Sequence, residues 1–527
     1  MRDFHSPGRS AVFAAEGMCA TSHPFGARIA IETLQAGGNA ADAAIASAVA
    51  MGLCEPHMTG IGGDCFVLLK PAGEDRLYGL NGSGRAPAGL SAAALRAEGL
   101  EALPGRSPQA VTVPGAVDAF DHLSRRWGRL GLADCLAPAI HYAEAGVPIA
   151  PRVAFDWATI GPGHFWGPGA EVLRAHGRAP RPGTLFQLPA QAAALRRIAA
   201  EGRDGFYTGP VAEDMVAALR AVGGPHTLDD FAATRCDEVE PVAGSYRGAE
   251  LWELPPNGQG AAAILLAQML EHFDLADLDP LGPERVHLEA EATKLAYDAR
   301  NRFIADPSRV DVPTDRLIAK ATAERLAADI RPDALLADPA PLVESVHRDT
   351  IYLVVVDGEG MAVSLIYSLF HGFGSGIVSE RYNILLHSRG AGFTLEEGHP
   401  NEARPGHRPM HTIIPAFLKT ELGEWMPFGV MGGAYQATGH ARFVSNLVDY
   451  GLDLQSAIDG PRAFWDDGTL KIERGYDDAT RQALIALGHR IAVPEIPIGG
   501  AQAIRIRKDG VLEGASDPRK DGCALGY

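Results

Sequence analysis

Thr350 is the residue whose type and position could do the most chemistry. It follows Asp349 and begins the apolar run 350–357, the strongest β pattern in the chain. A threonine hydroxyl is a poor nucleophile unless a nearby base takes its proton. A threonine at a new N-terminus supplies that base itself, because a free α-amine has a pKa of about 7.7–8.0. Thr350 could act in this way only if the chain were cut before it, and taken alone a threonine that begins a strand is far more often only structural.

The common nucleotide and zinc motifs are missing from the sequence. There is no G-x-x-x-x-G-K-[ST], no H-E-x-x-H and no C-x-x-C pair. Gly60–Gly63 resembles the start of a dinucleotide-binding loop, but Cys65 stands where the last glycine should be. We therefore expect no cofactor and no metal, and a Rossmann-type nucleotide enzyme is only a minor alternative.

The composition of the chain narrows the class of partner. Its 527 residues carry a formal net charge of -18, which argues against nucleic acid because a phosphate-binding face needs concentrated Lys and Arg. No apolar run reaches the length of a signal peptide or a membrane span. The six cysteines form no C-x-x-C pair and are typical of reduced, buried thiols. These features predict a cytoplasmic protein without a membrane or nucleic-acid partner.

The elements that must position Thr350 follow from the sequence pattern. A connector at 331–349 with three prolines runs directly into strand 350–357, and a Gly-Glu-Gly turn leads to a return strand at 361–369. A helix that stops at Gly37-Gly38, a second at 40–51 capped by Asn39, and strands at 65–69 and 76–80 precede it. The helices predicted for the middle of the chain are 114–127, 189–201, 210–222, 259–273 and 283–305. The pattern alone predicts a mixed α and β fold with a dominant hairpin at 350–369.

Several blocks of the sequence closely resemble the gamma-glutamyltranspeptidase family of N-terminal-nucleophile (Ntn) hydrolases, and they occur in family order from about residue 17 to 527. The blocks are Gly37–Ala44, Glu55–Gly63, Val113–Gly115, Phe206–Gly209, Glu291–Tyr297, Asp349–Thr350, Ala362–Ser364, Phe373–Ile377, Arg404–Pro409, Gly432–Gly433 and Gly514–Arg519. The resemblance implies an α+β fold, a four-layer αββα sandwich of the Ntn-hydrolase type. It also implies one domain formed by two autoproteolytic fragments, a large subunit at 1–349 and a catalytic small subunit at 350–527, held together as a heterodimer.

The resemblance also implies roles for single residues. Thr350 matches the nucleophile, and Gly432 and Gly433 match the backbone pair of the oxyanion hole. Ser368 stands where the family has a threonine that hydrogen-bonds the nucleophile's amine. Thr350 would first attack the carbonyl of Asp349 to cleave the chain. It would then attack the amide of a small-molecule substrate and pass the acyl group to water or to another acceptor.

The positions that would bind the substrate depart from the family's glutamate-binding pattern. Ser83 takes the place of the family's arginine, with Arg85 two residues later; His411-Thr412 replaces a serine pair; Phe370, Arg389 and Gly392 replace the groups that hold an α-amine. No acceptor for an ammonium group remains among these last three, and Arg389 adds a like charge. We therefore expect an acyl group with a carboxylate and no α-amine, oxamate-like or glutaryl-like. Arg85 and Arg389 are the candidate anchors, with structural ion pairs as the alternative.

Two other functions stay open at this point. Classical gamma-glutamyl transfer or glutathione hydrolysis is the alternative within the family, and a non-catalytic binding relative is the alternative of another class. The presence of Thr350, Ser368 and Gly432-Gly433 favours retained chemistry. The stretch from Phe393 to Arg404 is too short for a long lid loop, so we expect an open site.

Overall fold

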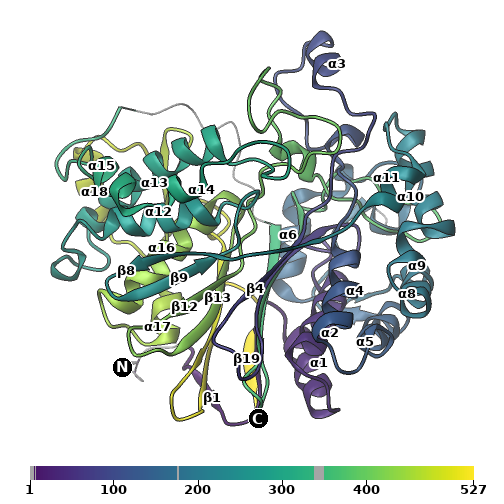
Figure 1. Cartoon of the computed structure of the whole chain (residues 1–527), viewed down its shortest axis with the longest axis horizontal. Coiled ribbons are helices and arrows are strands. Elements are labelled where there is room, and N and C mark those ends of the chain that lie inside the picture. Colours follow the sequence, from purple (N-terminus) through teal and green to yellow (C-terminus); the bar gives the residue numbers. More distant parts are fainter. Residues whose placement is uncertain (1–4, 6–7, 175–176, 338–348) are drawn as a thin grey trace.

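The computed structural model describes residues 5, 8–174, 177–337 and 349–527, and two seven-stranded antiparallel sheets form its centre (Figure 1). The first sheet has the order β1 (Val12–Ala14), β18 (Leu512–Ser516), β17 (Gly500–Ile506), β13 (Trp425–Met431), β12 (Ala416–Lys419), β9 (Ala249–Glu253) and β8 (Val242–Tyr246). The second has the order β19 (Cys523–Gly526), β2 (Met18–Thr21), β10 (Asp349–Val356), β11 (Ala362–Phe370), β3 (Asp64–Lys70), β4 (Tyr78–Gly82) and β7 (Asp237–Val239).

Helices cover the outer face of each sheet. In Figure 1, α12 (Gly260–Leu270), α13 (Pro283–Phe303) and α16 (Gln436–Val448) lie on one side of the strands, and α1 (Pro24–Gln35), α2 (Ala40–Cys54), α4 (Ala116–Trp127) and α5 (Leu132–Ala145) on the other. The two groups of helices pack in separate hydrophobic cores, and a third core fills the space between the sheets. The four-layer αββα sandwich is therefore confirmed.

The two faces of strand β10 pack in two different hydrophobic cores. Ile351, Leu353 and Val355 pack in the core with α1 and α2, whereas Tyr352 and Val354 pack in the core between the sheets. Successive side chains of a strand point to opposite faces, so a continuous apolar run suits a strand that is buried on both sides. The rigid layers on either side fix the start of this strand, where Thr350 lies.

The capping signal at Asn39 is also confirmed. The Asn39 side chain accepts hydrogen bonds from the peptide N–H groups of Ala41 and Asp42, and Asp42 accepts one in return from the Asn39 N–H. This capping box begins α2, and every residue of the helix is buried. Its many alanines let it lie close to the sheet, and it leads into the turn at 55–59 that contacts the start of β10.

The predicted helices in the middle of the chain are confirmed within a few residues. They are α4, α8 (Pro189–Glu201), α10 (Gly209–Ala221), α12 and α13. The same region holds the strands β7, β8 and β9, which were not predicted. The turn that joins β8 to β9 is Arg247-Gly248, with φ angles of 43° and 86°. A two-residue hairpin turn favours Asn-Gly or Asp-Gly, and Arg-Gly gives a much weaker signal.

The chain segments before and after Thr350 interleave in the sheets. Strands from before and from after Thr350 occur in both sheets, and β10 pairs with β2 on one edge and β11 on the other. Residues 331–337 of the predicted connector are largely exposed, and residues 338–348, with Pro339 and Pro341, lie outside the described residues.

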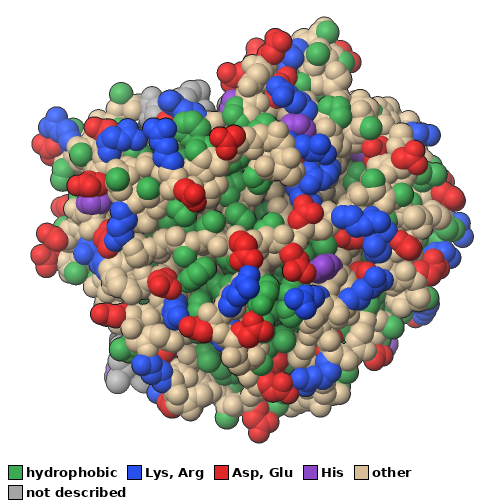
Figure 2. All heavy atoms as spheres, in the orientation of Figure 1, with side chains coloured by type: hydrophobic (Ala, Val, Ile, Leu, Met, Phe, Trp, Pro, Cys, Tyr) green, Lys and Arg blue, Asp and Glu red, His purple; other side chains and the backbone are tan. Residues whose placement is uncertain are grey.

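The distribution of charged side chains and the state of the cysteines agree with what the composition predicts. One face of the molecule carries basic and acidic side chains interspersed (Figure 2). All six cysteines are free thiols, four of them buried. Within the described ranges, no helix has the length and apolar character needed to pass through a lipid bilayer.

Candidate active site

Thr350 lies at an irregular point of the β10–β11 pair. Asp349 pairs with Phe370 and Ile351 pairs with Tyr367, so β11 has one more residue than β10 across this interval. Such a bulge turns a side chain away from the regular alternation, and bulges are frequent beside active sites. Thr350 is 2% exposed, and its hydroxyl donates to the Ser368 hydroxyl at 3.3 Å.

Arg389 brings a positive charge to the same hydroxyl. It begins the 3-10 helix η5 (Arg389–Gly392) and has no exposed surface. One guanidinium nitrogen donates to Ser368 Oγ at 3.4 Å and the other to Thr412 Oγ1 at 3.3 Å. The guanidinium also lies over the Phe370 ring, 4.2 Å from its centre, in cation–π geometry. We call Thr350, Ser368, Arg389, Thr412 and Phe370 the nucleophile cluster.

Asp64 supplies the negative charge beside this cluster. Its Oδ1 accepts the N–H groups of Gly84 and Gly115, and its Oδ2 lies 3.3 Å from His411 Nε2 and 3.5 Å from His387 Nδ1. Burial alone would raise the pKa of Asp64, but His387, His411 and Arg389 favour the carboxylate and lower its pKa to about 2. A stable anion therefore balances the buried guanidinium.

His411 is held neutral in this environment. Burial, and then the charge of Arg389, lowers the pKa of His411 to about 3. Its side chain contacts Asp64, and its ring lies 4.5 Å from that of Phe66. His411 thus touches the counter-ion of Arg389, and Asp64 connects it to the nucleophile cluster.

Gly432 and Gly433 follow the end of β13 and join the cluster through Gln259. The Gln259 side-chain amide donates to the Thr412 carbonyl at 2.7 Å and to the Gly433 carbonyl at 3.2 Å, and it accepts from Arg300 at 2.8 Å. Gly432 has φ of 131°, and a Cβ there would lie 3.0 Å from the Gly499 backbone. Only glycine adopts this conformation readily, so the turn after β13 depends on it.

Arg85 lies in a different set of contacts. Its guanidinium pairs with Asp306 at 2.8 Å and donates to the Gly406 carbonyl at 3.1 Å, with 27% of its side chain exposed. The structure therefore brings Arg389, and not Arg85, to the predicted nucleophile. Gly392 ends η5, and its carbonyl accepts from Asn401 at 2.7 Å.

Four residues of the site were not singled out by sequence reasoning. Asp64, His387, Gln259 and Met58 reach the cluster from separate elements: Asp64 from the first residue of β3, His387 from the stretch before η5, Gln259 from the residue before α12, and Met58 from the turn after α2. The one available signal was Asp64, a charged residue directly before the apolar run Cys65–Leu69 of the strand. The glycines before it let the backbone pass close to β11, since a Cβ at Gly63 would lie 2.5 Å from the Ser368 carbonyl oxygen.

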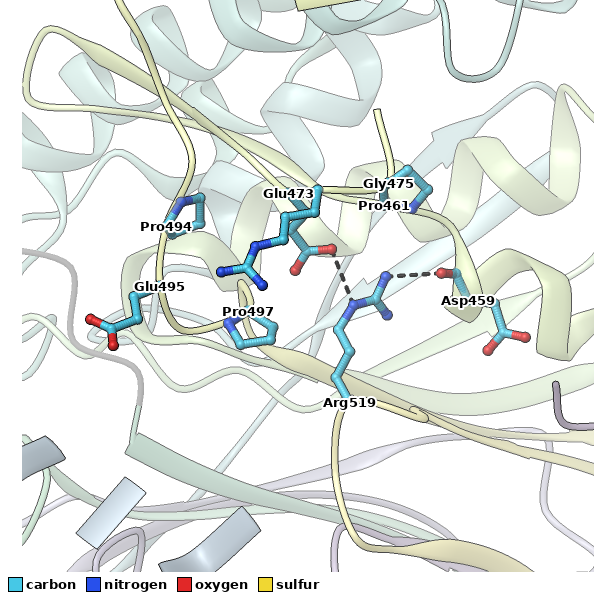
Figure 3. Close-up of a pocket in the computed structure, with 9 residues that line it drawn as sticks. Asp459, Pro461, Glu473, Gly475, Pro494, Glu495, Pro497 and Arg519 are labelled. Atoms are coloured by element: carbon cyan, nitrogen blue, oxygen red, sulfur yellow. Dashed lines mark hydrogen bonds and ion pairs between the residues drawn. The ribbon is translucent and has the colours of Figure 1, made fainter. Parts of the chain in front are cut away.

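A surface pocket lies apart from the nucleophile cluster (Figure 3). Arg519 spans it, donating to the Glu473 carboxylate at 3.1 Å and to the Asp459 carbonyl at 2.9 Å. Its lining shares no residue with the cluster. These bonds tie the C-terminal block Gly514–Arg519 to neighbouring loops, which indicates a structural role for that block.

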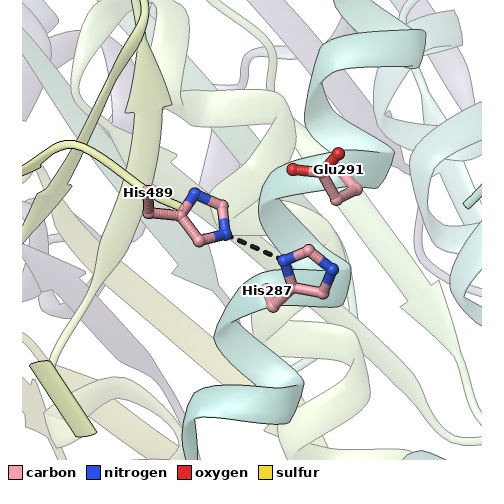
Figure 4. A group of neighbouring side chains, drawn as sticks. All are labelled: His287, Glu291 and His489. Carbon is pink, nitrogen blue, oxygen red and sulfur yellow. Dashed lines mark hydrogen bonds between the residues drawn. The ribbon is translucent and has the colours of Figure 1, made fainter. Parts of the chain in front are cut away.

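His287, Glu291 and His489 form a second buried group (Figure 4). His287 Nδ1 lies 2.8 Å from His489 Nε2, and its Nε2 contacts the Arg331 carbonyl at 2.8 Å. Their ligand atoms lie close enough to share a metal ion, but the Lys294 ammonium is 2.8 Å from Glu291 and already balances its charge. We interpret these three residues as a clamp, the histidine clamp, between α13 and the C-terminal part of the chain.

Comparison with known proteins gives one consistent result. The family model described as gamma-glutamyltranspeptidase matches residues 26–527. The Glutathione hydrolase-like YwrD proenzyme of Bacillus subtilis is 35% identical over 98% of this chain and 99% of its own length. The Oxamate amidohydrolase proenzyme of Klebsiella pneumoniae is 36% identical, over 98% and 99%. The crystal structure of a cephalosporin acylase from Bacillus halodurans superimposes with a TM-score of 0.91, at 37% identity, over 100% and 99%.

Proposed function

This chain belongs to the gamma-glutamyltranspeptidase family of hydrolases and transferases, and on that basis we propose that it is a self-processing amidohydrolase. The acyl group that it takes carries a carboxylate and no α-amine. The proposal rests on one observation, the buried guanidinium of Arg389, which contacts the same hydroxyl as the Thr350 side chain.

The first half of the proposed reaction is cleavage before Thr350. The Thr350 hydroxyl attacks the Asp349 carbonyl carbon, the peptide C–N bond breaks, and the acyl group moves from nitrogen to oxygen as an ester. Water then hydrolyses the ester and leaves a carboxylate on residue 349 and a free amine on Thr350. The products are the fragments 1–349 and 350–527, which the interleaved strands would hold together.

The second half uses the new amine as a general base. It takes the proton of the Thr350 hydroxyl as this oxygen attacks the substrate amide, and it returns a proton to the departing amine. The backbone N–H groups of Gly432 and Gly433 are the proposed donors to the oxyanion, and one such donor is worth roughly 3–4 kcal/mol in other enzymes. Water then releases the acid from the acyl-enzyme.

Charge supports a substrate without an α-amine. An ammonium group placed beside Arg389 would meet like charge in a site with almost no solvent, which is unfavourable. A carboxylate would instead receive charge-assisted hydrogen bonds from the guanidinium. The relatives named as oxamate amidohydrolase and cephalosporin acylase are compatible with this preference.

The same contacts support a short acyl chain. Arg389 Nη2 and Thr350 Oγ1 both contact Ser368 Oγ, at 3.4 and 3.3 Å. The distance between Nη2 and Oγ1 is therefore at most the sum of these two distances. An oxalyl ester has one C–C bond between its two carboxyl carbons, and a glutaryl ester has three more of about 1.5 Å each. A diacid of two or three carbons therefore fits this spacing better than a glutaryl group.

A gel and a substrate panel test the proposal. The purified wild-type protein should run as two fragments, one beginning Thr-Ile-Tyr-Leu, and Thr350→Ala should stay whole. Hydrolysis of oxamate should be faster than that of a glutaryl amide, and both faster than that of glutathione. Rapid glutathione turnover would overturn the substrate assignment, and an uncleaved wild-type chain would overturn the mechanism.

Substitution of Arg389 tests the anchor directly. Arg389→Leu should lower kcat/KM for oxamate by about 100-fold, because a buried charge-assisted pair is lost, while a neutral short amide is affected much less. Arg389→Lys should keep part of the activity, since it keeps the charge but not the planar fork. An equal loss for charged and neutral amides would exclude Arg389 as the carboxylate anchor.

A further inference from the structure

The turn after α2 contacts the atom that would become the catalytic base. The Thr350 backbone nitrogen donates to Met58 Sδ at 3.1 Å, and Met58 is 2% exposed. The Met58 N–H donates to the Glu55 carbonyl at 2.9 Å, and the Met58 carbonyl accepts from Leu369 at 3.0 Å. The turn is thus fixed against β11 beside Ser368, and the sulfur has a defined position.

A thioether is an unusual neighbour for an amine. It is a weak hydrogen-bond acceptor and carries no charge. A carboxylate at the same place would favour the protonated amine and raise its pKa, which would remove the base at neutral pH. Sulfur can therefore orient the nitrogen without supplying the negative charge that would keep it protonated.

Two charged groups of the surrounding elements lie near this site, and the anion among them is engaged by other partners. Arg389, from η5, reaches Ser368 and disfavours a second cation there. The carboxylate of Asp64, from β3, is engaged by two backbone N–H groups and lies against His387 and His411.

The turn of Met58 itself carries two more titratable groups. His57 pairs with Asp156 of α6 (Pro151–Ile160) at 3.2 Å. Glu55 accepts the Ser22 hydroxyl, and burial raises the pKa of Glu55 and so favours its neutral form. Among the contacts described for the Thr350 nitrogen, the acceptor is the sulfur of Met58.

We propose that Met58 is a positioning residue for the Thr350 amine: its thioether orients the amine toward the threonine's own hydroxyl and leaves it unprotonated at neutral pH. This inference rests on the proposed function, because the nitrogen becomes an amine only after cleavage. Ser368 was expected to contact this amine, but the contact described between Ser368 and Thr350 is with the threonine hydroxyl, and the nitrogen donates to Met58 instead.

Three variants of Met58 separate orientation from charge, each measured as kcat and kcat/KM against pH on the cleaved protein. Met58→Leu removes the acceptor at similar volume and should lower kcat by about 10-fold, with the acidic limb of the profile unmoved. Met58→Gln restores a neutral acceptor and should keep most of the activity. Met58→Glu adds a charge and should move the acidic limb up by about one pH unit or more.

Met215→Leu is the matched control, because Met215 is a fully buried methionine of α10. It should leave both kcat and the acidic limb at their wild-type values. A Met58→Leu enzyme with wild-type kcat, or a Met58→Glu enzyme with the wild-type acidic limb, would overturn the inference. If Met58→Glu stays uncleaved, the other two variants decide the question. A kcat lower in Met58→Leu than in Met58→Gln supports the inference, and equal values would overturn it. Failure of the proposed function itself is distinct, since the wild type would then show no fragment beginning at Thr350.

Discussion

Arg389 carries a full charge but has no exposed surface, so its neighbours decide what it can bind. The ring of Phe370 covers one face of the guanidinium, and two hydroxyls meet its nitrogens. Asp64 lies close enough to offset part of the cost of burying this charge and is itself kept ionised, with its pKa lowered. The guanidinium therefore stays charged in the interior and can donate charge-assisted hydrogen bonds to a small anion, whereas a cation beside it would meet like charge.

The glycine pair after β13 gives a prediction at this scale. Gly432→Ala should lower kcat by about 100-fold, because the added Cβ meets the Gly499 backbone and shifts the proposed oxyanion donors. Gly131→Ala is the control: Gly131 also has positive φ, 89°, but nothing lies within 4 Å of its added Cβ. Steady-state kinetics of both cleaved variants would measure the difference. Equal kcat in the two variants would argue against an oxyanion role for Gly432.

Among the secondary-structure elements, α2 links the fold to the site. It is buried along its whole length and ends at the turn that holds Met58. Its start depends on the capping box of Asn39, whose amide nitrogen also donates to the Trp127 carbonyl at 2.6 Å. The same helix therefore begins at a side-chain cap and leads at its other end into the turn whose Met58 contacts Thr350, the proposed nucleophile.

Removal of the cap should weaken the fold without changing the chemistry. Asn39→Ala should lower the free energy of unfolding by about 1 kcal/mol, because two N–H groups lose their acceptor. Denaturant titration would measure it, with kcat/KM unchanged on the folded protein. Ser91→Ala removes the cap of the short helix α3 (Ala92–Ala97), which projects from the body (Figure 1), and should have a smaller global effect. The reverse order of the two effects would contradict this view of α2.

The elements also show how far the sequence alone could lead. Thr350 and the hairpin after it stand out because a strong β run follows a connector, and the long helices stand out through caps and periodicity. Thr350, Ser368 and the glycine pair were predicted from motifs. The contacts of Arg389 with Ser368 and of Asp64 with His411 were not, because a motif does not show which side chains meet in the folded chain. The choice between Arg85 and Arg389 likewise needed the position of Asp306, which takes the guanidinium of Arg85.

For the whole molecule, the histidine clamp joins regions on the two sides of Thr350. Burial, and then the nearby His287 and Lys294, lowers the pKa of His489 to about 4. The unfolded side chain has a pKa of about 6.5, so between these values the unfolded chain binds the proton more readily. The stability that depends on neutral His489 is therefore complete above a pH of about 6.5 and is lost as the pH falls toward about 4.

This coupling predicts a pH-dependent melting temperature. The Tm of the wild type should fall between about pH 7 and about pH 4.5, and in His489→Gln this fall should be smaller by about 2 °C or more. Differential scanning calorimetry of both proteins at several pH values would measure it. His141→Gln is a suitable control, because His141 is exposed and lies on the outer helix α5. Parallel Tm curves for the wild type and His489→Gln would contradict a clamp that depends on protonation.

The pairing of β19 with β2 has a consequence for synthesis. These two strands lie side by side in the second sheet, although β2 spans Met18–Thr21 and β19 spans Cys523–Gly526. A ribosome must therefore translate past Gly526 before that edge of the sheet can close. If cleavage before Thr350 requires the closed sheet, chains from interrupted translation would remain uncleaved and inactive.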